Sequence, residues 1–325
     1  MPPLASRDSR RRHRPRRRTG VSLLEVGLKP GTRRRYRTAV LGFADWWDTN
    51  EVREGLSDRD YEQFDLGLSL YLQHLFDNDQ GKSKAASTIY GLYTYLPHAK
   101  GKLLMAERML KNWSRAEKSV PYPPLTWSLT CALAVHMAKR FGFCAGLAAL
   151  LAFDCLLRVG ELCSLLKEDV AYTGDDRLDD GILSGTVIRI AATKTGPDQS
   201  VLVERDEVTS LLKVRTDFLA DGTPLFPFSA ATFRRYFKLA CEELGLSSDY
   251  VPHSLRHGGC TSYHLRGHSV EDCMQRGRWA TTKSTRHYIQ AGRSLLLTMR
   301  SPKRVSDFGR RAARDILFVM LMAFR

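Results

Sequence analysis

Three prolines crowd the stretch VPYPPLTWS in the first half of the chain, at Pro121, Pro123 and Pro124. A proline ring lacks an N–H and clashes with the preceding helical turn, so no helix can run through this stretch. The chain has 325 residues and is 43% hydrophobic, which is enough for two domains with a core each. We therefore expect a basic arm at 1–20, a first domain at 21–118, a linker at 119–126, a second domain at 127–300 and an extension at 301–325.

The segment before the prolines has the apolar spacing of helices throughout. A helix capped by Thr32 would place Tyr36, Val40, Phe43 and Trp47 on one face. The same periodicity follows in YEQFDLGLSLYLQHLFDND, SKAASTIYGLYTYLPHAKG and KLLMAERMLKNWSRAEKS. We expect the first domain to be entirely helical.

The segment after the prolines mixes helices with a small sheet. Its apolar stretch Phe141–Leu157 is short for a membrane span and contains Asp154, so it predicts a buried core helix. The β-branched runs GTVIRIAA and QSVLVE flank TKTGPD and predict a hairpin with Lys194 near its tip. Helical patterns return in SAATFRRYFKLACEELGL, where Ser229 is the expected N-cap. The chain should be mainly α with one small sheet.

The chain is strongly basic, with 50 Lys and Arg against 35 Asp and Glu and a net charge of +15. This charge predicts a polyanionic partner such as nucleic acid or an acidic membrane surface. The arm at 1–20 contributes eight arginines against Asp8, and such an arm either binds phosphates, directs nuclear import or is a solvated tail without a partner. Phosphate contacts from the first domain are expected at Arg33, Arg34, Arg35, Lys82 and Lys84.

The seven cysteines form no C-x-x-C pair, so neither a disulfide framework nor a zinc ribbon is indicated. The arginine-rich start also lacks the apolar stretch of a secretory signal. We expect an intracellular, DNA-associated protein, in the nucleus of a eukaryote or in the cytoplasm and nucleoid of a bacterium.

Five of the nine histidines lie in the stretch His253–Ile289. Two pairs have the four-residue spacing of zinc ligands on a helix, His253 with His257 and His264 with His268. The H-x-x-x-H pattern lacks the glutamate of a metalloprotease, and the glycines at 258 and 259 should interrupt the helix. We therefore expect no metal here.

Phosphate chemistry is the second interpretation of this region. A phosphodiester under attack becomes doubly negative, and two guanidinium groups can bind its oxygens without a metal. Arg158 directly follows the apolar helix, and Arg256 lies one turn after His253, so both should be rigidly placed. An ion pair between Arg158 and Glu161 explains the first arginine equally well, and Glu161 could also orient it.

The motifs LLRVGELCSL, TKTG, PHSLRHGG and GRWATTKSTRHYI follow one another in this order. Together they resemble the tyrosine recombinase (phage integrase) family over about residues 125–289. The resemblance implies a SAM-like helical core-binding domain, followed by an α+β catalytic domain with a small β-hairpin. It implies the catalytic set Arg158, Lys194, His253, Arg256, Trp279 and Tyr288, with Glu161 in support. Trp279 precedes Tyr288 by nine residues, which is the family's usual interval.

The resemblance implies site-specific recombination of double-stranded DNA. Tyr288 would attack the scissile phosphate, form a 3′-phosphotyrosine and expel a 5′-hydroxyl. The other implied roles are phosphate binding by Arg158 and Arg256, proton transfer by His253 and Lys194, and a hydrogen bond from Trp279. The covalent link conserves the bond energy, so neither ATP nor a metal or other cofactor is expected. The implied assembly is a tetrameric synapse in which each chain's two domains clamp the duplex.

The sequence also departs from the family pattern. Gly277, Arg278 and Trp279 stand where the family often has Leu-Gly-His, so a hydrogen-bond donor remains but an acid or base is lost. The glycines at 258 and 259 should loosen the helix that carries His253. The apolar C-terminal stretch either docks on a neighbouring protomer or stays with its own chain, as a core helix folded back on its domain or as an unrelated extension.

Two other functions share these features. A type IB topoisomerase uses the same phosphotyrosine chemistry but relaxes DNA as a monomer. A DNA-binding relic of a mobile element would keep the fold without catalysis. The separate helical domain and the His-x-x-Arg spacing favour recombination over relaxation, and the full set of catalytic residue types argues against a relic.

Overall fold

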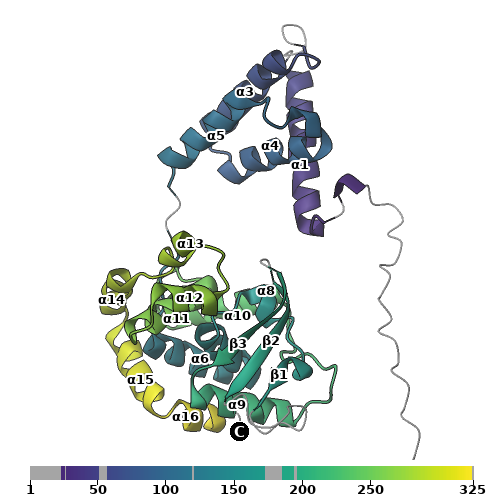
Figure 1. Ribbon diagram of the computed structural model, residues 1–325. Coiled ribbons are helices and arrows are strands. Elements are labelled where there is room, and N and C mark those ends of the chain that lie inside the picture. Colours follow the sequence, from purple (N-terminus) through teal and green to yellow (C-terminus); the bar gives the residue numbers. More distant parts are fainter. Residues whose placement is uncertain are drawn as a thin grey trace, which may run out of the picture. The chain divides into compact units, whose positions relative to one another are not determined.

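The computed structural model describes residues 23–25, 27–50, 57–118, 121–172, 185–193 and 196–323. The chain divides into two compact units, residues 1–119 and 120–325 (Figure 1). The basic arm at 1–20 and Lys194 lie outside the described residues. As predicted, the chain is mainly helical with one small antiparallel sheet.

Helices make up the first unit. Its elements are η1 (Leu23–Glu25), α1 (Pro30–Thr49), α3 (Tyr61–Asp77), α4 (Lys82–Tyr95), η2 (Pro97–Ala99) and α5 (Leu104–Ala116). The core is aromatic, since the Phe43 ring lies 5.5 Å from that of Trp47 and 5.2 Å from that of Tyr71. The expected cap at Thr32 is wrong. Helix α1 is capped by Lys29, three residues earlier, and begins at Pro30, whose fixed φ suits a first helical turn where an N–H would have no partner.

Asp65 joins two helices of the first unit. It is buried in α3, and its carboxylate accepts the backbone N–H groups of Met105 at 2.7 Å and Ala106 at 3.0 Å. These N–H groups belong to the first turn of α5, which has no intrahelical acceptors for them. The buried charge is therefore matched by the positive end of a helix.

The second unit surrounds two apolar helices, α6 (Trp127–Phe141) and α7 (Phe143–Asp154). Its other helices are α8 (Val159–Leu162), η3 (Lys167–Asp169), α9 (Asp206–Asp217), α10 (Ala230–Glu243), α11 (His253–Leu265), α12 (Val270–Gly277), α13 (Thr282–Arg286), α14 (Ala291–Arg300), α15 (Lys303–Arg314) and α16 (Ile316–Met322). The expected N-cap of α10 is present, since the Ser229 hydroxyl accepts the Thr232 N–H. Among the described residues, no helix is both long and apolar enough to cross a membrane.

The sheet of the second unit is a hairpin with one short extra strand. β1 (Val170–Ala171), β2 (Thr186–Thr193) and β3 (Gly196–Val203) pair antiparallel in this order. Ile188 pairs with Val170 on one side and Val201 on the other, and all three are buried in the core. Figure 1 shows α14 and α15 on the opposite side of this unit from the sheet.

The two glycines of the HGG motif do not interrupt α11, contrary to the prediction, because they are packing positions. A Cβ on Gly258 would lie 1.9 Å from the backbone oxygen of Leu125, and one on Gly259 would lie 2.0 Å from that of Phe153. Their missing side chains let α11 approach α7 and the proline segment closely. The glycines therefore fix this helix in place.

The ends of the second unit pack onto its core. Pro123, Pro124 and Leu125 of the expected linker are buried, and the Leu125 N–H donates to the Ser254 oxygen at 3.2 Å. At the other end, α15 packs along α6, where Gly309 lies close to the backbone of Ser128. The side chains of Ile316 and Met320 in α16 are fully buried in the same core. Of the two alternatives for the C-terminal stretch, the structure has it folded back on its own unit.

Candidate active site

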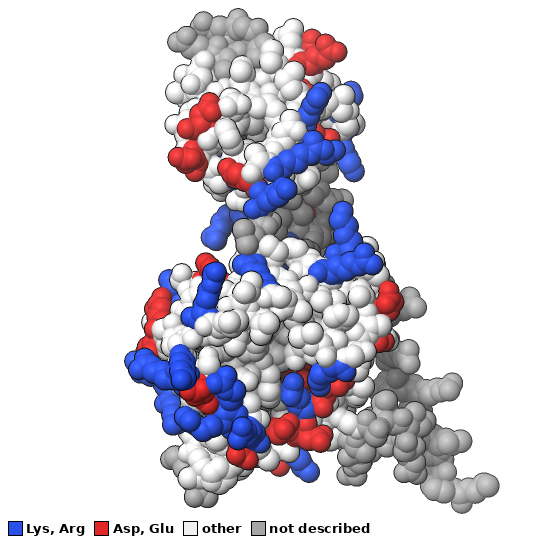
Figure 2. Space-filling view, turned by 90° about the vertical axis from the view of Figure 1, so that its left-hand side faces the viewer, with Lys and Arg blue, Asp and Glu red and all other residues white. Residues whose placement is uncertain are grey.

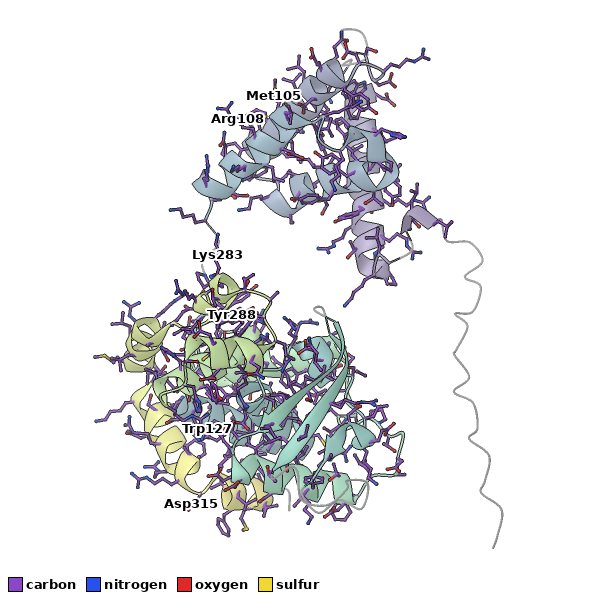
Figure 3. The ribbon with its side chains drawn as sticks, in the orientation of Figure 1. Met105, Arg108, Trp127, Lys283, Tyr288 and Asp315 are labelled. Atoms are coloured by element: carbon purple, nitrogen blue, oxygen red, sulfur yellow. The ribbon has the colours of Figure 1, made fainter. Side chains whose placement is uncertain are left out.

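Tyr288 follows α13 at the end of the second unit that α11, α12 and α13 form (Figure 3). Its hydroxyl lies 3.0 Å from Nε2 of His253, the first residue of α11. Burial, together with the positive charges of Arg256 and Arg158, lowers the pKa of His253 to about 4. The imidazole is therefore neutral near pH 7 and can accept the phenolic proton.

Trp279 packs directly against the tyrosine. The two rings lie 4.3 Å apart, and the Trp279 side chain is 9% exposed. Its indole N–H has no hydrogen-bond partner among the described residues. The indole thus fixes one face of the Tyr288 ring and holds a donor that can serve an oxygen of a bound ligand.

Arg256 is fully buried behind the two rings. Its guanidinium donates to the backbone oxygens of Leu156 and Gly277, and it lies 4.6 Å from the Trp279 ring and 5.6 Å from the Tyr288 ring. Burial and the charges of neighbouring arginines lower the pKa of Arg256. Because a guanidinium keeps its proton in proteins, this site holds a fixed positive charge.

Arg158 and Glu161 are paired, as one sequence interpretation expected. The Arg158 guanidinium donates to Oε1 of Glu161 at 2.5 Å, and the Arg158 backbone N–H donates to Oε2 at 2.9 Å. Burial would raise the pKa of Glu161, but these bonds and the nearby arginine charges lower it below its usual value. Since Arg256 lies 4.0 Å from Oε2, the same carboxylate orients two arginines. The ion pair and the orienting role therefore coexist.

Sequence reasoning missed Arg278 as a member of this cluster. Its side chain is buried between α7 and α12, and it donates to Oε2 of Glu161 at 3.1 Å and to the Leu156 oxygen at 3.0 Å. Its backbone is left-handed, with φ of +55°. The signal was the arginine at a position where the family often has glycine, which is the residue that such a backbone favours.

The sequence suggests only a metal-ligand role for His257, whereas in the structure it contacts the tyrosine. Its ring stacks on that of Tyr288 at 4.3 Å, and its Nδ1 lies 2.8 Å from Nε2 of Gln290. Burial and the neighbouring positive groups lower the pKa of His257 to about 3. Neutral His257 therefore covers the tyrosine ring while His253 faces its hydroxyl.

The structure thus gathers five of the six predicted catalytic residues, Arg158, His253, Arg256, Trp279 and Tyr288. The sixth, Lys194, lies outside the described residues between β2 and β3. Beside the cluster, a hollow of about 390 Å³ is lined by Gln199 and Ser200 of β3 together with Arg278 and Trp279. Within the described residues, no three His, Cys, Asp or Glu side chains are grouped to hold a metal ion.

The five basic residues predicted to contact DNA differ in their surroundings. Arg33 pairs with Glu25 at 3.3 Å, and Lys82 donates to the backbone oxygen of Glu117 at 2.8 Å. Arg34, Arg35 and Lys84 are exposed. The five basic residues are therefore not equivalent. One on α1 and one on α4 already have protein partners, and the other three do not bind these partners.

Basic side chains also gather low on the second unit in the view of Figure 2. The exposed side of α15 carries Lys303, Arg304, Arg310, Arg311 and Arg314. Arg310 pairs with Asp307 on the same helix. The remaining positive charges on α15 face solvent and suit an anionic partner.

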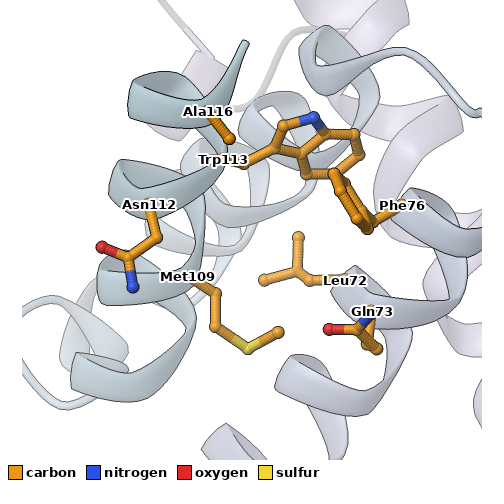
Figure 4. A pocket seen from close by; sticks show the side chains of 7 residues that line it. All are labelled: Leu72, Gln73, Phe76, Met109, Asn112, Trp113 and Ala116. Atoms are coloured by element: carbon orange, nitrogen blue, oxygen red, sulfur yellow. The ribbon is translucent and has the colours of Figure 1, made fainter.

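A separate cavity of about 270 Å³ lies in the first unit, between α3 and α5 (Figure 4). It is lined by Leu72, Gln73, Phe76, Met109, Asn112, Trp113 and Ala116. None of these side chains titrates near neutral pH, so the cavity offers no acid, base or charged ligand group. The predicted catalytic side chains that the structure describes all lie in the second unit, near Tyr288.

Comparisons with known proteins concern the fold and one segment of the chain. No curated protein matches the sequence. The lambda integrase tetramer bound to a Holliday junction has a TM-score of 0.54 at 20% identity, covering 82% of this chain and 73% of that one. The lambda integrase dimer bound to a COC′ core site has a TM-score of 0.53 at 20% identity, covering 83% and 74%.

The Tn1549 transposon integrase in complex with circular intermediate DNA has a TM-score of 0.50 at 16% identity, covering 71% of this chain and 84% of that one. At these identities the likeness concerns the fold. The family model described as "Phage integrase family" matches residues 135–294, which include all six predicted catalytic positions. Residues 135–294 therefore form a domain of the phage integrase family.

Proposed function

We propose that this protein is a site-specific DNA recombinase that cuts and rejoins strands through a 3′-phosphotyrosine. The observation that carries the proposal is the 3.0 Å contact between the Tyr288 hydroxyl and a neutral His253, beside buried arginine charge. A phenol becomes a good nucleophile when an adjacent base takes its proton. Arg158 and Arg256, called here the phosphate arginines, would neutralise the charge that develops on the phosphate.

In the cleavage step, the Tyr288 oxygen forms a bond to phosphorus and the bond from phosphorus to the 5′-oxygen breaks. The phenolic proton passes to Nε2 of His253, and the leaving 5′-oxygen takes a proton from Lys194. Trp279 donates its indole N–H to a phosphate oxygen. Rejoining reverses these transfers when the 5′-hydroxyl of another strand attacks the phosphotyrosine, so no external energy source is consumed.

The related structures support duplex DNA as the partner and assembly on it as the working state. Lambda integrase is found as a dimer on a core site and as a tetramer on a Holliday junction. By analogy, we propose that this chain binds double-stranded DNA as a multimer. Exposed basic side chains on both units, including Arg34, Arg35 and Lys84, would contact phosphates. DNA affinity should therefore fall steeply as the salt concentration rises.

A nicked suicide duplex tests the chemistry. A target site is first selected from a random duplex library, and the wild-type protein is then incubated with the nicked site. We expect a denaturant-resistant protein–DNA band for the wild type and for Tyr263→Phe, which removes a nearby tyrosine hydroxyl. Tyr288→Phe should bind the duplex but give no band.

Two other outcomes would change the assignment. Binding without a band from any variant would contradict the proposal and favour a non-catalytic DNA-binding protein. A wild-type band together with relaxation of supercoiled DNA by a dilute monomer would instead favour a type IB topoisomerase.

A further inference from the structure

Arg278 holds two turns of the second unit together. One turn ends α7 and the other ends α12. The Arg278 guanidinium donates to the backbone oxygens of Cys155 at 3.4 Å, Leu156 at 3.0 Å and Arg276 at 3.1 Å. It also donates to Glu161 at 3.1 Å, and its side chain is 3% exposed. A buried guanidinium with four acceptors is fixed in position and does not need solvent to stabilise its charge.

Both turns have strained backbones. Among the described residues, only Asp79, Leu156 and Arg278 are non-glycine residues with left-handed φ, and the last two are joined by a hydrogen bond. Such strain persists only where the surrounding contacts enforce it, and it concentrates at functional sites. Glycine would adopt the backbone of Arg278 at lower cost, so the arginine side chain must compensate for the strain.

Glu161 is the point at which the cluster's charges meet. Its carboxylate has one negative charge and three arginine neighbours, namely Arg158 at 2.5 Å, Arg278 at 3.1 Å and Arg256 at 4.0 Å. Arg278 is thus closer to Oε2 than Arg256 is. Without Arg278, only Arg158 and Arg256 would neutralise Glu161, and the carboxylate would draw on charge that the phosphate needs.

We infer that Arg278 is a positioning residue that neutralises Glu161 and so leaves the charge of the phosphate arginines available to the scissile phosphate. This inference rests on the proposed function. Two net positive charges then remain in the cluster, which match the two negative charges of a phosphodiester under attack. Arg278 also holds the turn before Trp279 in place, because it ties that turn to Leu156.

The neighbouring Arg276 provides a matched control. It is buried two residues earlier in the same segment, but it pairs with Glu204 at 3.2 Å and with the backbone oxygen of Asp154 at 2.7 Å. Arg276→Gln therefore removes a buried arginine without removing a partner of Glu161. In a variant that already carries Arg276→Gln, adding Glu161→Gln should not restore the rate of adduct formation.

The test is a double-mutant cycle on the suicide duplex, measured as the single-turnover rate of adduct formation. Arg278→Gly keeps the left-handed backbone and removes the cation, and we expect the rate to fall about 10- to 100-fold. Adding Glu161→Gln removes the uncompensated carboxylate, and the double variant should be at least about threefold faster than Arg278→Gly alone. DNA affinity should change less than about threefold, because Arg278 does not reach the surface.

A double variant slower than either single variant would overturn the inference. Removing Glu161 would then not rescue the loss of Arg278, as expected if Arg278 has only a structural role. Rescue of Arg276→Gln by Glu161→Gln would overturn it as well. Thermal unfolding reports whether each variant is folded. If Arg278→Gly does not fold, Arg278→Lys and Arg278→Met give a pair of similar shape that differs in charge. The lysine variant should then be the faster one, and equal rates would contradict the charge account.

The wild-type reaction separates this inference from the proposed function. If wild-type protein forms no adduct on a site that it binds, the proposed function fails before Arg278 is considered. If wild-type protein forms the adduct and Arg278→Gly forms it at the same rate, the proposed function stands and the inference fails.

Discussion

The first unit has an aromatic interior, whereas the second has an aliphatic interior that becomes charged near Tyr288. Among the described residues of the first unit, Asp65 is the only buried ionisable side chain other than tyrosine, and it meets the positive end of α5. The second unit buries Asp154, Glu161, Asp169, Arg256, His257, Arg276 and Arg278. Buried charge is costly unless it is paired, so its concentration in one unit needs an explanation.

The difference between the units lies in the sign of the charge left over. The charge of Asp65 is balanced by the backbone N–H groups at the start of α5, so Asp65 leaves no uncompensated charge in the interior of the first unit. Around Glu161, three arginines share one carboxylate, and positive charge remains beside the Tyr288 hydroxyl. An enzyme that stabilises a doubly negative phosphate has a use for such an excess, whereas a domain that only needs to fold has none.

The largest effect should come from the buried arginine next to the tyrosine. Arg256→Lys keeps a positive charge but cannot bond the oxygens of Leu156 and Gly277 while facing a phosphate. We expect the single-turnover cleavage rate to fall about 10²- to 10³-fold. The matched control is Arg235→Lys on the exposed side of α10, which should cleave like the wild type. A cleavage rate for Arg256→Lys within tenfold of the wild-type rate would contradict the claim that the buried guanidinium of Arg256 serves the cleavage step.

Packing glycines in the two units should differ in cost. A Cβ on Gly258 meets the backbone of Leu125, whereas one on Gly67 in α3 meets the Trp47 ring at 2.1 Å. A ring can shift more easily than a backbone segment. We expect Gly258→Ala to lower the free energy of unfolding by about 3 kcal/mol and Gly67→Ala by about 1 kcal/mol.

Calorimetry or denaturant unfolding of the full chain measures both substitutions. Gly292→Ala in α14 is the control, because nothing lies within 4 Å of the added Cβ. It should raise the free energy of unfolding by up to about 1 kcal/mol, because alanine favours a helix more than glycine does. Equal losses for Gly258→Ala and Gly67→Ala would contradict the view that the catalytic unit is held by backbone contacts.

The second unit should also lose stability in mild acid. Its folded state keeps His253 and His257 neutral down to pKa values of about 4 and about 3, while unfolded histidine titrates near pH 6.5. Between these values the unfolded chain binds more protons, so stability is complete above about pH 6.5 and falls as the pH falls toward 4. The slope should approach about 1.4 kcal/mol per pH unit for each histidine, less a part for solvent screening of His253.

Unfolding curves at several pH values measure this slope. His257→Gln should reduce the slope by about half, while the first unit, which buries no histidine among its described residues, should show a weaker dependence. Protonation of His253 would block proton transfer from Tyr288. Because the pKa of His253 is about 4, the imidazole stays neutral between pH 5 and 7, and the cleavage rate should stay level over this range. A rate that halves near pH 6.5 would mean that His253 titrates like a free histidine.

The sequence predicted a helical first unit, the apolar helix α7 and the hairpin of β2 and β3, but not the short strand β1. It also predicted that His253, Arg256 and Trp279 lie near Tyr288, but not that His257 stacks on its ring. Glycine at 258 and 259 misled the prediction, since a helical pattern cannot reveal that another backbone lies against the helix. The start of α1 was misplaced at Thr32 because a proline can begin a helix as well as end one.

Arg278 escaped prediction for a different reason. Arginine is rarely buried and rarely left-handed, so neither composition nor spacing marks it as part of a core. Its role becomes visible only when Glu161 and the Leu156 oxygen are seen to converge on it from a segment far away in sequence. The sequence shows the departure from glycine at this position, but not the acceptors that bind the arginine.

The smallest effects, on DNA affinity, should come from substitution of the exposed basic residues of the first unit. Arg34→Gln, Arg35→Gln and Lys84→Gln should each lower the slope of log affinity against log salt by about 0.9, as expected for one phosphate contact. Arg33 and Lys82 already have protein partners, so their glutamine variants should lower it less. Titrations of duplex DNA at several salt concentrations measure these slopes. Equal effects at all five positions would show that the partners in the free protein do not matter.

The central claim is that the charge gathered around Glu161 serves one nucleophile, Tyr288. The most direct test is mass spectrometry of the trapped wild-type adduct after digestion with nuclease and trypsin. Cleavage after Arg286 and Arg293 yields the peptide HYIQAGR, in which Tyr288 is the only tyrosine. We predict that this peptide carries the mass of a 3′-linked nucleotide. The same mass on the peptide HGGCTSYHLR, which contains Tyr263, or on any other tyrosine peptide, would contradict the account.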